Sequence, residues 1–172
     1  MNQRLYRIDE CHPILRAPVL RLVELCDQKL ARKLLVTHGF RSVQEQMLIY
    51  QKGRTYNRES QVWEVTDAAA VVSKSKPGLS AHNVVTLTGK PASMAVDVIP
   101  LRADGAADWA VDDNFWDALY ELAWKVGLDP LGDPTGSYLA GDKGHFEEPA
   151  WKLKLAALEC YQPVNQFGGA PV

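Results

Sequence analysis

Four side chains of the kinds that bind metals or transfer protons lie in three separate stretches of the sequence. His82 stands in SAHN, Asp97 in AVDV, and both Asp142 and His145 in DKGH. Hydrolytic zinc sites commonly use three such imidazole or carboxylate ligands and leave a fourth position for water. A single histidine, however, is more often a hydrogen-bonded loop or core residue than a ligand. The residue types alone leave both interpretations open.

Asp97 is the most informative of these residues because it interrupts an apolar run. It stands between Val96 and Val98 in a segment that reads as a strand. Burying a carboxylate costs several kcal/mol unless the charge is paired or bound to a metal. We therefore expect Asp97 to have a cationic partner or a metal beside it.

The stretches GFRS, SKPGLSAHN, MAVDV and DKGHFE occur in this order between residues 37 and 149. In this they resemble a family of zinc metallopeptidases that includes D-alanyl-D-alanine carboxypeptidases, D-alanyl-D-alanine dipeptidases and phage L-alanyl-D-glutamate endolysins. The signature of that family is S-x-H, A-x-D and [DE]-x-x-H, and all three pieces are present. As a set the pieces are specific, although any one alone would be weak.

The resemblance implies a role for each matching residue. It implies one Zn²⁺ ion with three ligands: His82, Asp97 and His145. Asp142 would be the general base, because a carboxylate three residues before a ligand can stand beside the metal without binding it. Arg41, in GFRS, would stabilise the oxyanion of the tetrahedral intermediate. Ser80 would be a supporting residue near the site.

The same resemblance implies zinc-dependent hydrolysis of a peptide bond in peptidoglycan stem peptides. An L-alanyl-D-glutamate endopeptidase of the endolysin type is the first expectation, and a D-alanyl-D-alanine dipeptidase or carboxypeptidase is the alternative. A non-catalytic wall-binding domain of the same fold is a third hypothesis, although it would have no need of a base at Asp142. The Gly- and Pro-rich stretch 129–141 is expected to decide between a closed pocket and an open groove.

One spacing departs from the family pattern. The first histidine of the family stands seven residues before the aspartate, whereas His82 stands 15 residues before Asp97. Because longer loops cost little additional closure entropy, we expect the chain to make an excursion here and keep the site. With TGKP (88–91) as its turn, a hairpin would pair Leu87 with Ala92 and set His82 opposite Asp97.

The helices and strands expected around these residues indicate an α+β fold. In this fold a small antiparallel sheet carries the zinc site and packs against several helices. Apolar periodicity and capping signals predict helices over about 13–34, 43–52, 112–126 and 149–161. Strands are expected in 84–88, 93–99 and 145–147, and residues 53–62 are expected to be a loop. We expect one domain over 1–161 and a mobile tail over 162–172.

Composition excludes several other classes of protein. The 172 residues carry a net charge of −2 and no long basic run, so no nucleic-acid partner is expected. Lacking a long apolar segment, the chain is expected not to insert into a membrane, to carry no signal peptide and to reach the wall only after the membrane is breached. His12 and His38 are expected to be structural or exposed. A monomer with three reduced core cysteines is expected: Cys11, Cys26 and Cys160.

Overall fold

The computed structural model describes residues 3–131 and 142–163. The helical elements are η1 (Gln3–Glu10), α1 (Pro13–Leu30), α2 (Val43–Tyr50), η2 (Ala68–Ala70), η3 (Ala81–Asn83), α3 (Asp113–Lys125) and α4 (Trp151–Lys154), where η marks a 3-10 helix. The strands are β1 (Leu34–His38), β2 (Arg54–Asn57), β3 (Val62–Val65), β4 (Val85–Thr86), β5 (Ala95–Pro100), β6 (Asp129–Pro130), β7 (His145–Glu147) and β8 (Cys160–Tyr161). The predicted α+β class is confirmed.

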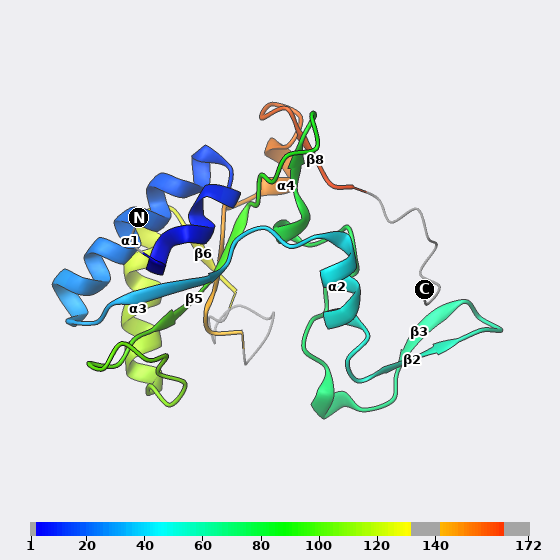
Figure 1. The fold of residues 1–172 in the computed structure, drawn as a ribbon, viewed down its shortest axis with the longest axis horizontal. Helices are drawn as coiled ribbons and strands as arrows, with labels where there is room; N and C mark the ends of the chain where they lie inside the picture. The colour runs from blue at the N-terminus through cyan, green and yellow to red at the C-terminus, as the bar shows by residue number, and fades with distance from the viewer. Residues whose placement is uncertain (1–2, 132–141, 164–172) are drawn as a thin grey trace.

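We call the described residues outside 39–83 the body of the molecule. A four-stranded antiparallel sheet forms its centre, with the strand order β1-β5-β7-β6. Helices α1 and α3 pack together beside it, as Figure 1 shows. Apolar residues from one stripe of each helix meet the inward-facing residues of the strands, among them Leu15, Leu119, Val96 and Phe146, all fully buried. This layer of helix on sheet is the main hydrophobic core, and it holds β5 and β7 in place.

A smaller apolar cluster lies at the start of β5. It is built from short elements: Ala81, Val84, Ala92, Met94, Ala95, Trp151 and Cys160 are all buried there. Helix α4 and the two-stranded sheet of β4 and β8 belong to this part of the molecule. The cluster therefore supports the short helix η3, in which His82 lies.

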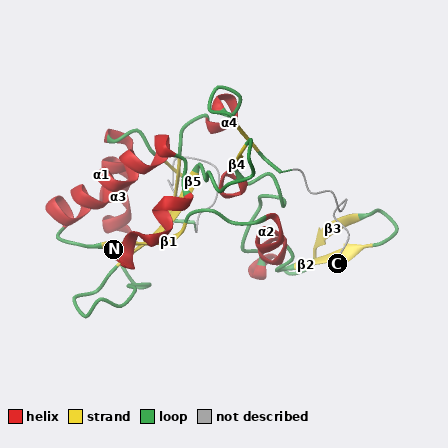
Figure 2. Cartoon of the chain, turned by 45° about the horizontal axis from the view of Figure 1, so that its top comes forward, coloured by secondary structure: helices red, strands yellow, loops and turns green. Residues whose placement is uncertain are grey.

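Residues 39–83, here called the arm, leave the sheet after β1 and return at η3. Helix α2 and the β2–β3 hairpin belong to it and extend away from the helical body (Figures 1 and 2). The predicted loop over 53–62 is wrong, because β2 and β3 form an antiparallel hairpin there. Tyr56 and Trp63 stack across it with ring centroids 5.3 Å apart, and this cross-strand pair does not appear in the polar pattern of the segment.

The first three predicted helices are confirmed, with changes of a few residues at their ends. Helix α2 has the predicted capping box between Ser42 and Glu45, and Asp112 caps α3. The last predicted helix, over 149–161, is much shorter than expected. The chain leaves it after α4, because β8 pairs with β4 instead of continuing the helix.

The excursion between His82 and Asp97 contains a turn, but its register differs from the prediction. Val85 lies opposite Pro91, and the Thr86 amide donates to the Lys90 carbonyl at 2.9 Å. Gly89 adopts a φ of 78° and closes a turn with Thr86, so the chain reverses earlier than expected. The predicted pairing of Leu87 with Ala92 and of His82 with Asp97 is therefore wrong.

Two sequence predictions fall partly outside the described residues. Residues 132–141 of the stretch 129–141, which was expected to decide between a pocket and a groove, lie outside them, as do residues 164–172 of the tail predicted over 162–172. The three cysteines are buried and unpaired: Cys11, Cys26 and Cys160. Among the described residues, no helix combines the length and apolar character that crossing a bilayer requires.

Candidate metal centre

Three side chains from distant parts of the chain converge at one end of the sheet. His82 Nε2 lies 3.3 Å from Asp97 Oδ1 and 3.3 Å from His145 Nδ1, and the third edge, His145 Nδ1 to Asp97 Oδ1, is 3.1 Å. A tetrahedral zinc site with bonds of about 2.0–2.1 Å has ligand-to-ligand edges of roughly 3.3–3.4 Å. The donor set and its triangle therefore fit a zinc ion.

Strand register brings two of these residues together. Asp97 on β5 and His145 on β7 are direct partners in the antiparallel ladder. Directly opposed residues point to the same face of a sheet, with Cβ atoms about 4.5–5.5 Å apart. The ladder and the apolar residues between α3 and the sheet thus fix this pair before any metal binds.

His82 comes from the arm and is held by a different device. It lies in η3, a single turn preceded by its N-cap residue Ser80, whose hydroxyl accepts a hydrogen bond from the His82 amide at 3.3 Å. Asn83, fully buried, accepts from the amides of Gly78 and Ser80 and donates to the Arg41 carbonyl at 2.7 Å. The predicted supporting residue Ser80 therefore acts on the conformation of the His82 turn.

The two ends of the arm are joined by hydrogen bonds that we call the base clamp. The Arg41 amide donates to the His82 carbonyl at 3.0 Å, and the Asn83 side-chain amide donates to the Arg41 carbonyl. The His82 Nδ1 atom lies 2.6 Å from the Gly39 carbonyl oxygen. A carbonyl only accepts, so Nδ1 carries a proton, and Nε2, which faces Asp97 and His145, is the ring nitrogen that could bind a metal. A side chain at position 39 would meet the Arg7 carbonyl at 2.5 Å, so a glycine is required there.

Arg41 lies at the site, where its guanidinium contacts Asp97. Nη2 donates to Asp97 Oδ2 at 3.0 Å and Nη1 donates to Gln46 Oε1 at 2.9 Å. Gln46 is fully buried and in turn donates to the Ser75 carbonyl at 2.8 Å. The Nε atom of Arg41 is buried and has no partner among the described residues. The guanidinium therefore binds the second carboxylate oxygen of Asp97, and its Nε–H group makes no hydrogen bond with the described residues.

His38 lies closer to the site than sequence reasoning placed it. A bulge in β1 between Val36 and His38 shifts the register, so that His38 becomes the partner of Asp97. Its Nδ1 atom lies 3.6 Å from Asp97 Oδ2, and its side chain is 48% exposed. His12, by contrast, has the structural role expected of it, because its ring accepts a hydrogen bond at the start of α1.

The charges of the cluster stabilise one another. Burial alone would raise the pKa of Asp97, but the adjacent His82 and the hydrogen bonds from His145 and His82 hold that pKa well below its usual range. Burial alone would lower the pKa of His145, but hydrogen bonds to Asp97 and Glu147 raise it to about 10. Metal-free, the centre is thus an ion pair whose proton a zinc ion must displace.

Asp142 lies beside the cluster in the turn that leads into β7. The His145 amide donates to its carbonyl at 3.2 Å, and burial raises the pKa of its carboxyl group. The turn packs closely against β5, because the Val98 amide donates a hydrogen bond to the Gly144 carbonyl at 2.8 Å. A Cβ at Gly144 would lie 2.3 Å from the Val98 carbonyl oxygen, so only glycine allows this approach.

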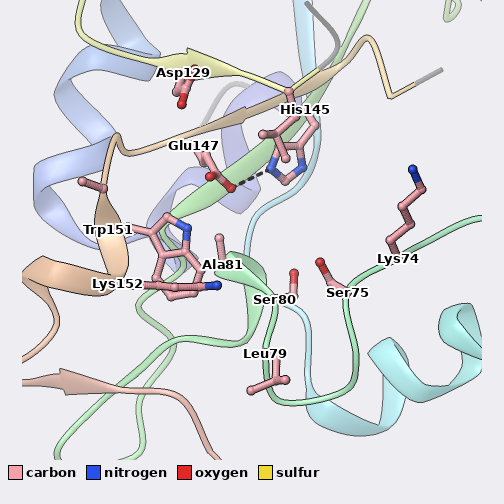
Figure 3. A pocket seen from close by; sticks show the side chains of 12 residues that line it. Lys74, Ser75, Leu79, Ser80, Ala81, Asp129, His145, Glu147, Trp151 and Lys152 are labelled. Carbon is pink, nitrogen blue, oxygen red and sulfur yellow. Dashed lines mark hydrogen bonds and ion pairs between the residues drawn. The ribbon is translucent and has the colours of Figure 1, made fainter. Parts of the chain in front are cut away.

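A pocket of about 450 Å³ opens next to His145 (Figure 3). Its walls come from the arm, from β6 and β7, and from the start of α4. Two lysines and two carboxylates line it, with Trp151 on one side: Lys74, Lys152, Asp129 and Glu147. Glu147 Oε2 lies 3.3 Å from His145 Nε2. The pocket therefore offers both signs of charge and an apolar surface beside the candidate metal centre.

Sequence reasoning missed several residues that shape the centre. Gln46, Asn83 and Glu147 were not singled out. His38 was expected to be structural or exposed, and it is exposed, although it lies beside Asp97. Only Glu147 had a signal that could be read, since it stands two residues after His145 in a strand and must share its face. Gln46 and Asn83 act through contacts with residues 29 and 42 positions away, which no local pattern encodes.

Comparison with known proteins gives the fold a context. The sequence matches no family model and no curated protein. One similar solved structure is a point mutant of the vancomycin-resistance D,D-pentapeptidase VanY from a VanB-type cassette, in complex with Zn(II). It is 16% identical in sequence, the similarity covers 86% of this chain and 78% of that chain, and the TM-score is 0.52. VanYB in complex with D-alanine-D-alanine gives 16% identity, 85% and 75% coverage and a TM-score of 0.51.

A third solved structure is similar over a larger share of both chains. The L-Ala-D-Glu endopeptidase ChiX of Serratia marcescens is 15% identical over 88% of this chain and 90% of its own, with a TM-score of 0.49. The two VanY structures agree with the fold that the motifs implied. The chain therefore has the fold of the VanY-type D,D-peptidases.

Proposed function

We propose that this protein is a zinc-dependent peptidase that hydrolyses a peptide bond in peptidoglycan stem peptides. The observation that carries the proposal is the triangle of His82, Asp97 and His145, whose edges of 3.1–3.3 Å suit one zinc ion. The VanY structures support it, since one was solved with Zn(II) and another with D-alanine-D-alanine.

The residues around this triangle divide the chemical work. When bound, zinc supplies a Lewis acid that polarises the scissile carbonyl and lowers the pKa of water. Asp142 accepts the proton of the attacking water and delivers it to the departing amine, a role helped by the raised pKa of its carboxyl group. Arg41 keeps Asp97 oriented and brings positive charge to the side where the oxyanion develops.

The pocket beside His145 is where we place the substrate. A stem peptide carries free carboxylates and an amine, and the pocket presents Lys74 and Lys152 together with Asp129. Trp151 and Leu79 supply apolar surface for alanyl methyl groups. This complement of charges favours a peptide over a purely anionic or purely cationic ligand.

Among stem-peptide bonds, we propose the L-alanyl-D-glutamate bond first and the D-alanyl-D-alanine bond as the alternative. The former requires a groove open at both ends and the latter a pocket closed around a free carboxylate. An endolysin role, in which the enzyme reaches the wall after the membrane is breached, belongs to the first alternative.

Digestion of purified peptidoglycan tests these proposals directly. Mass spectrometry of the products should reveal new D-glutamyl amino termini for the endopeptidase, or released D-alanine for the alternative. A chelator should abolish the products, and added zinc should restore them. Wall binding without any new terminus would instead support the non-catalytic hypothesis.

A further inference from the structure

We infer that Glu147 is a positioning residue, which fixes the imidazole of His145 for metal binding by accepting a hydrogen bond from its Nε2–H group. The inference rests on the proposed zinc site and adds a residue that the family motifs do not contain. His145 and Glu147 lie two positions apart in β7, so both side chains leave the strand on the same face. Figure 3 shows the two groups in contact.

The geometry assigns a separate task to each nitrogen of His145. Nδ1 faces Asp97 Oδ1 at 3.1 Å and His82 Nε2 at 3.3 Å, whereas Nε2 faces Glu147 Oε2 at 3.3 Å. A neutral imidazole has one N–H group and one lone pair, and only the lone pair can bind a metal. With Nδ1 turned toward the other two ligands, the proton must stay on Nε2. Glu147 supplies the acceptor that keeps it there.

The two histidines of the centre obtain this support in different ways. The N–H group of His82 is directed at the Gly39 carbonyl, a neutral acceptor fixed by the backbone. The N–H group of His145 is directed at a carboxylate carried by a side chain. A carboxylate partner raises the basicity of the ligating imidazole as well as fixing its orientation, and loss of such partners typically weakens metal binding by about 10–100-fold. The support of His145 is therefore the one that a point mutation can remove.

The surroundings of Glu147 leave it room for this task. Ala95 is its partner on β5, and Asp129 is its partner on β6. The small Ala95 leaves space for the glutamate side chain, which is 18% exposed at the pocket wall. Because Glu147 also faces the pocket, two other roles must be separated from positioning: transfer of a proton during catalysis, and binding of a substrate amine.

The test compares zinc affinity and ligand geometry, using the full-length protein. Glu147→Ala removes the acceptor, and Glu147→Gln keeps an oxygen that can accept the same hydrogen bond. Asp129→Asn is the matched control, since it removes one negative charge from the same pocket. Zinc affinity is measured by competition with a chromophoric chelator, and the visible absorption of the Co²⁺-substituted protein reports on the ligand field.

We expect Glu147→Ala to bind zinc about 10–100-fold more weakly than wild type and to shift the Co²⁺ spectrum. Glu147→Gln and Asp129→Asn should stay within about threefold of wild type. At saturating zinc, the kcat of Glu147→Ala should recover most of the wild-type value. Should Glu147→Ala fail to fold, Glu147→Met fills similar volume without an oxygen acceptor and is expected to show the same loss.

Two results would overturn the inference. Wild-type zinc affinity in Glu147→Ala with a kcat reduced 100-fold or more would make Glu147 a proton-transfer group, and an increase in KM alone would make it a substrate contact. Failure of the wild-type protein to bind zinc or to cleave peptidoglycan would instead contradict the proposed function. The two failures are therefore distinguishable.

Discussion

The body and the arm deliver their parts of the candidate metal centre by different physical means. Asp97 and His145 are paired by a strand ladder that a large apolar core holds in register. His82 lies at the end of an excursion of more than forty residues, roughly a quarter of the 172 in the chain, and is held by the hydrogen bonds of the base clamp. In this protein a candidate ligand on a sheet is placed by strand register, whereas a candidate ligand on a long connection is placed by its own polar anchor.

Removal of either kind of ligand should have the largest effect. His145→Ala in the body and His82→Ala in the arm should each lose tight zinc binding and reduce peptidase activity to background. Because zinc binds only the folded state, both variants should also lose the rise in melting temperature that zinc gives wild type. Metal analysis and calorimetry check this. Stoichiometric zinc in His82→Ala would mean that the arm contributes no ligand.

Replacement of the proposed base, Asp142, should separate chemistry from metal binding. Asp142→Asn is expected to keep its zinc, because the amide has nearly the same size and the three ligands remain. Its kcat should fall by about 10²–10⁴-fold with little change in KM. Steady-state kinetics and metal content provide the measurement. A zinc-free Asp142→Asn would make Asp142 a ligand, and a fully active one would leave it no role as base.

In the zinc-free protein, the ion pair of the body should make stability depend on pH. His145 has a folded-state pKa of about 10, raised from 6.5, so its stabilising contribution is complete below pH 6.5 and is lost as the pH rises toward 10. Asp97 has a lowered pKa, so its contribution is present above its ordinary value of 3.8 and is lost at more acid pH.

Denaturant unfolding of chelator-treated protein should therefore show this contribution at its largest between about pH 4 and 6.5. Zinc affinity should change in the opposite sense and increase with pH, because binding must displace the proton of His145. His145→Ala serves as the control and should lose the decline in stability toward pH 10. An unchanged decline in that variant would assign it to other groups.

Loosening of the base clamp should have the smallest effect and should act on the arm alone. Asn83→Ala leaves the Arg41 carbonyl and two amides without their partner, at a cost of about 1–3 kcal/mol. We expect zinc affinity to fall about tenfold while the amides of β5 and β7 keep their protection from hydrogen exchange. Leu119→Ala provides the contrast, because a cavity in the core should cost about 2–5 kcal/mol of global stability. Equal loss of protection in both variants would contradict the distinction between arm and body.

Local patterns in the sequence predicted the three longest α-helices, two of them in the body and one in the arm. Apolar periodicity and capping residues are local signals, and the helices they predicted, α1, α2 and α3, are present. The polar β2–β3 hairpin was missed because its strands are short and partner each other through one aromatic pair, Tyr56 and Trp63. Helix α4 was overestimated because pairing of β8 with β4, a long-range contact, overrides local helix propensity.

The sequence by itself determined which residues could form the centre. The types and order of His82, Asp97, Asp142 and His145 follow from the chain alone, and a buried charge at Asp97 already required a partner. Only the tertiary structure decided how they meet. The turn between His82 and Asp97 closes in a register that does not pair these two residues, and His145 is the ladder partner of Asp97 on β7. The contributions of Gln46 and Asn83 became visible only there, because hydrogen bonds between distant segments depend on how the backbone is packed and leave no periodic trace in the sequence.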